Sequence, residues 1–448
     1  MSAETRAPGW PERLLRPFAE VRAGEALTAL VLAATIFLIL TSYYLLKVIR
    51  EPLILLSGGA EVKAYAAAGQ ALLLIPVLRV HGAIASRVSR FKLITIIFLF
   101  VASNLVVFAV LLKARVAIGL SFYLWVGTFN YLLVATFWSF ANDVYTPEQG
   151  KRLFAIVGVG SSVGALAGAA LASFLLKHLS PLHLMLASAA LLVVTLIPFA
   201  VVNTQRSCCP KDRGRELTKD EPLTGAGGFQ ALLSDRYLLL IGVITILANW
   251  VTNSGEYVLD KTLIEVARSS AMADPGKFVG QFKAEYFWWV NLVAVIGQFF
   301  VVSRVLKYLG VGSALLVLPL VSMTGAMGIV IFPVLSFIRL AKIAEKGVEY
   351  SLETTAVNAL YLVVSRDAKY KAKAVIDTFL VRSGDVCAAA SIWIGTHLGI
   401  QTHGFAAMNV VLTATWFLVA WRVRALHLAR SGALESPPFR AGSPAPST

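Results

Sequence analysis

Charge, cysteine and histidine are all scarce in this sequence, and each shortage argues against a class of protein. Charged residues make up only 15% of the 448 residues, well below the roughly 25% usual in soluble globular proteins. Three cysteines are too few for a disulfide framework, so we expect reduced thiols. Six histidines show no metal-ligand spacing, and the chain has neither a Walker motif nor a Ser-His-Asp order. We therefore expect no metal site, no cofactor, no catalytic residue and no ATPase.

Long apolar runs dominate what is present. Hydrophobic residues make up 57% of the chain, and the mean hydropathy is +0.73. A run of about 20 apolar residues is long enough to cross a bilayer as a helix. The sequence therefore predicts an all-α integral membrane protein with twelve transmembrane helices. They are expected near 27–47, 64–84, 93–112, 117–142, 153–176, 182–202, 237–258, 283–303, 312–331, 334–363, 374–396 and 404–422.

A single long polar break divides these spans into two sets of six. It holds prolines, a glycine cluster and mixed charge, which favours a flexible linker. The halves also echo each other, because Ser-Arg-Val-Ser-Arg-Phe at 86–91 follows the second span and Ser-Arg-Val-Leu-Lys-Tyr at 303–308 follows the eighth. This pattern predicts two six-helix pseudo-repeats, the major-facilitator-like architecture. The expected parts are a cytoplasmic tail at 1–26, bundles at 27–202 and 236–424, a cytoplasmic linker at 203–235 and a disordered tail at 425–448.

Lysine and arginine concentrate in alternate loops and in both tails. The positive-inside rule then places both termini in the cytoplasm. The same bias accounts for the net charge of +15, so a nucleic-acid partner is not expected. The first apolar run lacks a cleavage pattern and should stay as an anchor. The alanine-rich chain without a transit sequence favours a bacterial inner membrane, and a chain whose two halves complete one pathway is expected to be a monomer in the lipid bilayer.

One predicted span, 334–363, carries six charged residues spaced mostly three or four apart. At 3.6 residues per turn they fall within about a third of the helix circumference. A charge at the bilayer centre costs at least about 2.5–3.5 kcal/mol, so this stripe should face a wet cavity inside the bundle and mark a candidate substrate path. Its members are Arg339, Lys342, Glu345, Lys346, Glu349 and Glu353.

Other spans also carry polar side chains. The first has Tyr43, Lys47, Arg50 and Glu51, the fourth ends in Asn142 and Asp143, the seventh has Asn249, Asn253, Glu256 and Asp260, and the eleventh has Asp377, Arg382 and Asp385. Two explanations stand. One is structural ion pairing between helices, such as Glu349 or Glu353 with a cation of the first span, and the other is a substrate or ion site. The first-span cations also lie near a predicted span end, where long side chains can snorkel to the interface.

Glycines recur at every fourth position in the fifth span, at Gly160, Gly164 and Gly168. Small residues spaced in this way let two helix backbones approach closely inside a membrane. The pattern therefore predicts a tight contact between this helix and a neighbour.

Five segments are distinctive. They are Tyr-Leu-Leu-Lys-Val-Ile-Arg-Glu at 44–51, Phe-Trp-Ser-Phe-Ala-Asn at 137–142, Asn253 with Glu256, Tyr-Ser-Leu at 350–352 with Tyr361, and Lys-Ala-Lys-Ala-Val-Ile-Asp at 371–377 with Arg382 and Gly384. Together they resemble the corresponding segments of the ATP:ADP antiporter (nucleotide transporter) family. The likeness is spread over both halves. It implies a major-facilitator-like fold and the exchange of nucleotides or related anions across a membrane.

The same segments depart from the family pattern at positions that matter for the substrate. Glu349 stands where the family has a lysine before Tyr-Ser-Leu, and Asp385 stands where it has a lysine after Arg-x-Gly. Residues 354–358 are Thr-Thr-Ala-Val-Asn where the family has Asp-Pro-Thr-Lys-Glu. Phosphate groups need cationic donors at close range, so the two carboxylates would repel a polyphosphate unless other residues compensate. The resemblance thus implies a divergent member.

We predict a secondary transporter, not an enzyme, that works by alternating access on a small anion, with ATP and ADP as candidates. The alternatives are a transporter-like receptor or scaffold, and a proton-coupled major-facilitator-type transporter of a non-nucleotide substrate. The predicted substrate-binding residues are Lys47, Arg50, Trp138, Asn142, Asn253, Glu256, Lys342, Lys346, Glu349 and Arg382. The predicted coupling or ion-pair residues are Glu51, Asp143, Asp260, Glu353, Asp377 and Asp385.

Overall fold

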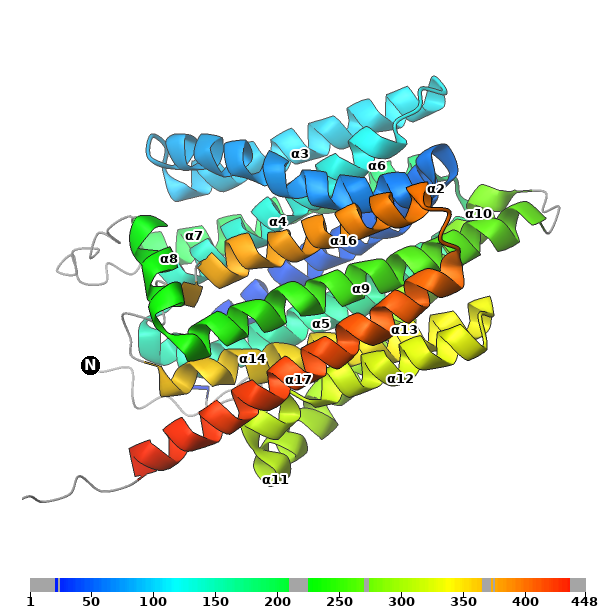
Figure 1. The fold of residues 1–448 in the computed structure, drawn as a ribbon. Helices are drawn as coiled ribbons and strands as arrows, with labels where there is room; N and C mark the ends of the chain where they lie inside the picture. Colours follow the sequence, from blue (N-terminus) through cyan, green and yellow to red (C-terminus); the bar gives the residue numbers. More distant parts are fainter. Residues whose placement is uncertain are drawn as a thin grey trace, which may run out of the picture.

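The computed structural model describes residues 21–22, 25–208, 225–269, 274–364, 372–373 and 375–435, and every element within them is helical. Figure 1 shows one bundle in which the start of the first described helix and the end of the last one lie at the same end. We call this the terminal end, and the other the opposite end. Eight of the described helices are long and apolar enough to cross a membrane. The all-α membrane fold is confirmed, and the count of twelve spans stays a prediction.

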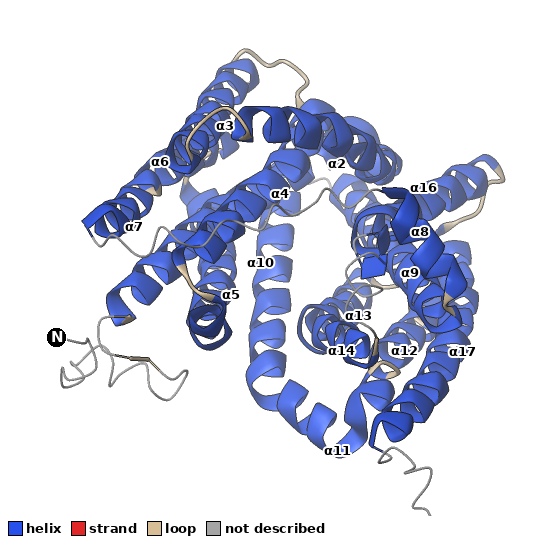
Figure 2. Ribbon diagram, turned by 90° about the vertical axis from the view of Figure 1, so that its left-hand side faces the viewer, coloured by secondary structure: helices blue, strands red, loops and turns tan. Residues whose placement is uncertain are grey.

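The first half of the chain is built from long helices. They are α2 (Ala26–Ala85), α3 (Arg90–Lys113), α4 (Gly119–Val144), α5 (Pro147–His178), α6 (Pro181–Val194) and α7 (Leu196–Cys208). Figure 2, viewed from the terminal end, shows these helices grouped on one side of the molecule. Large apolar side chains such as Leu72 point outward, as expected for a surface that faces lipid.

The second half is more interrupted. Its elements are α8 (Gly225–Ser234), α9 (Arg236–Ser269), α10 (Pro275–Ile296), η2 (Gly297–Val301), α11 (Val302–Ala314), α12 (Val317–Ile331), α13 (Leu335–Val348), η3 (Glu349–Glu353), α14 (Thr354–Leu360), η4 (Tyr361–Val363), η5 (Ile376–Leu380), α16 (Val381–His397) and α17 (Thr402–Glu435). The segments η2, η3 and η5 are π-helical. One apolar core continues from α2, α4 and α5 into α9 and α10, so the two halves share part of their interior.

Helix α2 corrects the prediction for the first two spans. We expected the first span to end at residue 47 and the second to begin at 64, but the helix continues to Gly58 and resumes at once. The break is Gly59, whose φ of +78° lies in the left-handed region that favours glycine. The charged residues of 48–63 therefore lie within helix and not in a loop.

Two further predicted segments contain helix that the sequence did not indicate. Within the predicted linker, residues 225–234 form the helix α8, and only 209–224 fall outside the described residues. Within the predicted disordered tail, α17 continues to Glu435. This extension is held by contacts, because His427 Nδ1 lies 2.8 Å from the hydroxyl of Tyr237, and Arg430 forms two hydrogen bonds to Asp235 at 2.7 and 3.1 Å.

The predicted tight helix contact is confirmed between α5 and α2. A Cβ atom added to Gly160 would lie 2.4 Å from the carbonyl oxygen of Ala33, and one added to Gly164 would lie 2.6 Å from that of Phe37. At Gly168 the distance to the carbonyl oxygen of Thr41 would be 2.8 Å. The backbones thus touch over about two helical turns, and only glycine fits at these three positions.

Near the terminal end, Glu25 ties the start of α2 to the start of α5. Its carboxylate accepts hydrogen bonds from Arg152 at 3.1 and 3.2 Å, from Gln149 Nε2 at 3.1 Å and from the backbone N–H of Arg22 at 3.1 Å. Partial burial alone would raise the pKa of Glu25, but these hydrogen bonds outweigh it and hold the pKa below its ordinary value.

Replacing Glu25 with glutamine is expected to lower the stability by about 1 kcal/mol at pH 7, because hydrogen bonds to a charged group are lost. A lowered pKa in the folded state means that this contribution is present above the unfolded pKa of about 4.3 and is lost as the pH falls through the folded value. Apparent melting temperatures in detergent should therefore differ between E25Q and the wild type at pH 7 and converge only as the pH falls below about 4. The exposed Glu265→Gln serves as the control, and a gap that persists at low pH would contradict the assignment.

Candidate functional site

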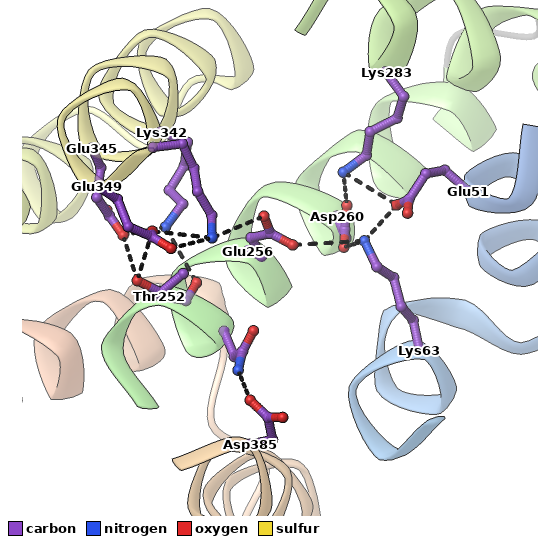
Figure 3. Close-up of polar contacts among 12 residues, drawn as sticks. Glu51, Lys63, Thr252, Glu256, Asp260, Lys283, Lys342, Glu345, Glu349 and Asp385 are labelled. Carbon is purple, nitrogen blue, oxygen red and sulfur yellow. Dashed lines mark hydrogen bonds and ion pairs between the residues drawn. The ribbon is translucent and has the colours of Figure 1, made fainter. Parts of the chain in front are cut away.

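Four charged side chains meet between the halves, toward the opposite end of the bundle. Glu51 and Lys63 lie on α2, one on each side of its break, while Asp260 lies on α9 and Lys283 on α10 (Figure 3). The ammonium of Lys63 lies 2.5 Å from Glu51 Oε2 and 2.6 Å from Asp260 Oδ2. That of Lys283 lies 3.6 Å from Glu51 Oε2 and pairs directly with Asp260. All four residues are at most 6% exposed, so these charges, which we call the inter-half cluster, compensate one another away from water.

A second group of charges lies on α13 and its π-helical extension. Lys342 Nζ lies 2.6 Å from Glu345 Oε1 and donates to the carbonyl oxygen of Thr252 at 3.2 Å. Lys346 Nζ lies 3.1 Å from Glu349 Oε2. The hydroxyl of Thr252 lies 3.4 Å from both carboxylates, Glu345 and Glu349. Four members of the predicted stripe therefore lie against α9 inside the bundle, whereas Arg339 pairs with Glu285 of α10 at 3.1 Å.

Glu256 on α9 connects the two groups. Its Oε2 lies 4.0 Å from Lys63 Nζ, and its Oε1 lies 3.9 Å from Lys346 Nζ. These distances are at the limit of an ion pair, so Glu256 is held loosely between two cations from different halves of the protein (Figure 3). A carboxylate in this position can change partner when the halves move.

Helix α16 adds a third contribution, at Asp385. Its carboxylate accepts a hydrogen bond from Arg382 at 3.0 Å and another from the side-chain amide of Asn253 at 2.7 Å. The predicted residues Asn253, Arg382 and Asp385 are thus brought together, with Asn253 linking α16 to α9.

A cavity of about 30 Å³ opens among these helices. It is lined by Ala60, Lys63, Ala64, Ala67, Tyr123, Asn253, Glu256, Tyr257, Asp260, Asp385 and Ala388. A space of this size with charged walls suits ordered water and is too small for a nucleotide. The lining comes from both halves, so its size depends on how far apart the halves stand.

Lys47 and Arg50 lie against aromatic rings. The ammonium of Lys47 is 4.2 Å from the ring centre of Phe287 and 5.0 Å from that of Tyr44. The guanidinium of Arg50 is 4.6 Å from the ring centre of Tyr123, and its Nε lies 3.4 Å from Glu51. Because α2 continues past both residues, they lie well inside the helix, and the expected snorkelling to a span end does not apply. Among the five cations predicted for the substrate site, Lys47 alone has no carboxylate partner in the described part of the chain.

The residues predicted at the end of α4 lie apart from this network. Asn142 is exposed and sits 19 residues along α4 from Tyr123, which is about 28 Å of helix. Asp143 Oδ2 pairs with Arg90 at 2.6 Å. Trp138 packs on its own neighbours near the terminal end of the same helix. In this conformation Trp138, Asn142 and Asp143 make no described contact with the charged residues between the halves. Their role in a substrate site stays a prediction.

Two predicted carboxylates differ from expectation. Asp377 is not buried in the membrane interior, because its side chain is 51% exposed and pairs with Lys373 at 2.9 Å. Glu353 is 7% exposed, and neither of its carboxylate oxygens has a hydrogen-bond partner among the described residues. The π-helical turn η3 precedes the next helix and breaks the regular 3.6-residue stripe. The suggested pairing of Glu349 or Glu353 with first-span cations is wrong, because Glu349 pairs with Lys346 and Glu353 has no partner among the described residues.

Sequence reasoning missed Lys63 and Lys283. Both were assigned to loops or span ends, because charges normally mark the limits of an apolar run. A signal was present, since Lys283, Tyr286, Phe287 and Val290 follow helical spacing, and all four are buried on α10. That signal places Lys283 on an inward face, but its partners on α2 and α9 come from distant parts of the chain.

The fold defines a class, the helical membrane proteins of major-facilitator-like architecture. The nucleoside transporter NupG superposes with a TM-score of 0.58 and 12% identity, over 92% of this chain and all of that one. A POT family transporter in complex with 5-aminolevulinic acid gives a TM-score of 0.61 and 12% identity, over 91% of this chain and 96% of that one. At such low identity these likenesses concern the fold alone.

The family follows from the sequence match. The TLC ATP/ADP transporter model matches residues 122–371, and the chain belongs to this family, as the motif resemblance predicted. ADP,ATP carrier protein 1 of Chlamydia pneumoniae is 25% identical over 356 residues, 68% of this chain and 66% of that protein. ADP,ATP carrier protein 4 of Rickettsia conorii is 21% identical over 345 residues, 66% of this chain and 65% of that protein. The match thus spans just under two thirds of the length of each relative.

Proposed function

We propose that this protein is a secondary transporter that exchanges nucleotides or related anionic metabolites by alternating access. Membership of a family described as ATP/ADP transporters supports the substrate class. The observation that carries the proposal is a buried charge network built jointly by the two halves of a transporter fold. Charge buried between two bundles is typical of a pathway that opens to either side in turn.

The distribution of contacts between the halves supports alternating access. The polar contacts described between them run from the middle of the bundle to the opposite end, from Tyr44 with Asn291 at 3.0 Å to the ammonium of Lys277 with the carbonyl oxygen of Lys177 at 3.1 Å. This arrangement fits a state that is closed at the opposite end, where the ion pairs of the inter-half cluster hold the two halves together. Opening that end requires these ion pairs to separate.

Lys47 and Arg50 are the proposed anion-binding pair. Their aromatic surroundings hold both cations in place without neutralising Lys47, so one ammonium is left for a substrate oxygen. Lys342, Lys346 and Arg382 of the other half are proposed to bind the anion as well, after their ion pairs with carboxylates have separated. Substrate binding would then draw the two halves together around the charge.

The proposal includes a setting. We propose that both termini lie on the cytoplasmic side of a bacterial inner membrane. The basic loops support this, as does the fact that α2 begins and α17 ends at the same end of the bundle (Figure 1). The protein would act as a monomer within the lipid bilayer, because the described network is built by the two halves of one chain.

Proton coupling is a second candidate, and Glu353 is the observation that favours it. A buried carboxylate with no described donor or cation beside it has nothing to stabilise its negative charge, so it can bind a proton. Exchange and proton coupling are separable, since an exchanger needs internal substrate and no pH gradient, whereas a proton-coupled carrier responds to the gradient.

The experiment is counterflow in liposomes. Purified protein is reconstituted with unlabelled nucleotides, phosphorylated metabolites or organic anions inside, and uptake of the labelled compound is followed with and without a pH gradient. Exchange predicts transient accumulation that requires internal substrate. Folded protein that binds a ligand without counterflow would favour a receptor and overturn the proposal.

Replacing Lys47 with glutamine is expected to weaken the apparent affinity for the exchanged anion about tenfold or more, because a cation free to meet a phosphate oxygen is removed. The concentration dependence of counterflow measures this effect. The exposed Lys113→Gln at the end of α3 is the matched control and should behave as the wild type. Equal affinity in K47Q and K113Q would remove Lys47 from the binding site.

A further inference from the structure

The described charge network is almost balanced. We count the residues joined by ion pairs in the inter-half cluster, around Glu256, at Lys342 and Lys346, and at Asp385, together with Lys47. Glu353, whose buried carboxylate faces no described cation or donor, is counted as protonated. The seven cations are Lys47, Arg50, Lys63, Lys283, Lys342, Lys346 and Arg382, and the six carboxylates are Glu51, Glu256, Asp260, Glu345, Glu349 and Asp385. The formal charge is therefore +1.

Two of these carboxylates neutralise cations that would otherwise face the substrate path. Glu349 Oε2 lies 3.1 Å from Lys346 Nζ, and Asp385 Oδ2 lies 3.0 Å from Arg382 Nη1. Each pair lies three residues apart on one helix, so it forms within the helix and does not depend on how the halves are placed. Without the two negative charges, the same network would carry a formal +3.

The charge of the network limits the charge of a well-bound substrate. One phosphate monoester carries about −1.5 to −2 at pH 7, and a di- or triphosphate carries more. Uncompensated charge in a site removed from water is strongly unfavourable. A network with one cation in excess complements a single phosphate, whereas a polyphosphate would have to displace Glu349 and Asp385 from their own partners.

We propose that the substrate is a nucleoside monophosphate rather than a di- or triphosphate, and that Glu349 and Asp385 set this preference by occupying Lys346 and Arg382. The inference rests on the proposed function and narrows its substrate class. Lys47, which has no carboxylate partner in the described residues, supplies the excess charge that the single phosphate meets.

The test uses the full-length protein and a graded series of ligands: adenosine, AMP, ADP and ATP. Dissociation constants are measured by titration in detergent for the wild type, E349Q, D385N and the double variant, and counterflow is measured with the same compounds. The wild type is expected to bind AMP at least about tenfold more tightly than ADP or ATP. The double variant is expected to gain about tenfold or more in affinity for ADP, because two cations are released. Glu285→Gln is the matched control, since it removes an exposed partner of Arg339 outside the network.

The outcomes separate the two proposals. A wild type that binds and exchanges ADP or ATP in preference to AMP would overturn the inference and leave nucleotide exchange standing. Adenosine bound as tightly as AMP would also overturn it, because the anionic group would then have no part in binding. No binding or exchange of any nucleotide or other anion would overturn the proposed function as well. If the double variant does not fold, the wild-type series decides the matter by itself.

Discussion

Replacing Gly164 with leucine is expected to leave little correctly folded protein in the membrane. At this position a Cβ atom alone would lie 2.6 Å from the carbonyl oxygen of Phe37 and 2.8 Å from its Cα. The obstacle is backbone, which cannot rotate away as a side chain can, so α2 and α5 would have to separate. Overpacking of a rigid interior typically costs about 1–3 kcal/mol or more, and here the separation would also break the hydrogen bond from Thr41 Oγ1 to the carbonyl oxygen of Gly164.

The measurement is the yield of monodisperse protein by size-exclusion chromatography, together with its apparent melting temperature. Gly158 provides the matched control, because it lies on the same helix and a Cβ there would meet nothing within 4 Å. Gly158→Leu should give a normal yield. Equal yields from G164L and G158L would show that the contact between α2 and α5 does not limit folding.

Replacing Lys283 with methionine is expected to destabilise the protein by about 3–5 kcal/mol, the usual result of removing one partner from a buried ion pair. Lys283 is 1% exposed and lies beside Glu51 and Asp260. Its removal leaves Asp260 beside Lys63 alone among the described cations, while Glu51 keeps Lys63 and Arg50. Methionine keeps most of the volume, so the effect is one of charge and not of a cavity.

The double variant Lys283→Met, Asp260→Asn provides the decisive comparison. It removes one charge of each sign and should recover much of the stability that K283M loses, as measured by the apparent melting temperature. Lys113→Met, at the exposed end of α3, should have no effect. If K283M were as stable as the wild type, the inter-half cluster would contribute nothing to holding the halves together.

Some of this site follows from the sequence, because periodicity is a local property. The spacing of Lys342, Lys346 and Glu349 placed them on one face of a helix, and that face does lie against α9. The spacing of Glu256 and Asp260 likewise put both on the inward side of α9. In each case a charged face could not lie against lipid, so it had to face the interior of the bundle.

The inter-half cluster does not follow from the sequence. A run such as residues 48–63 combines apolar and charged residues, and the charged ones look like the end of a span. The charged residues are tolerated inside the helix because Glu51 pairs with Lys63, twelve residues along the chain, and with Lys283 on a different helix. Such pairs depend on how distant segments pack, and no local pattern records them. For the same reason Trp138 and Asn142, whose motif predicted a place in the site, lie at the far end of α4.

The π-helical segments give the molecule an internal asymmetry. All three that the described residues contain, η2, η3 and η5, lie in the second half, and η2 packs on η3, where a Cβ added to Gly297 would lie 2.7 Å from Ser351 Oγ. A π-helical turn is a strained, locally weakened part of a helix. Among the described residues, the first half has a break at Gly59 of α2, whereas the second half has three π-helical segments, so we expect the second half to deform more easily within its helices.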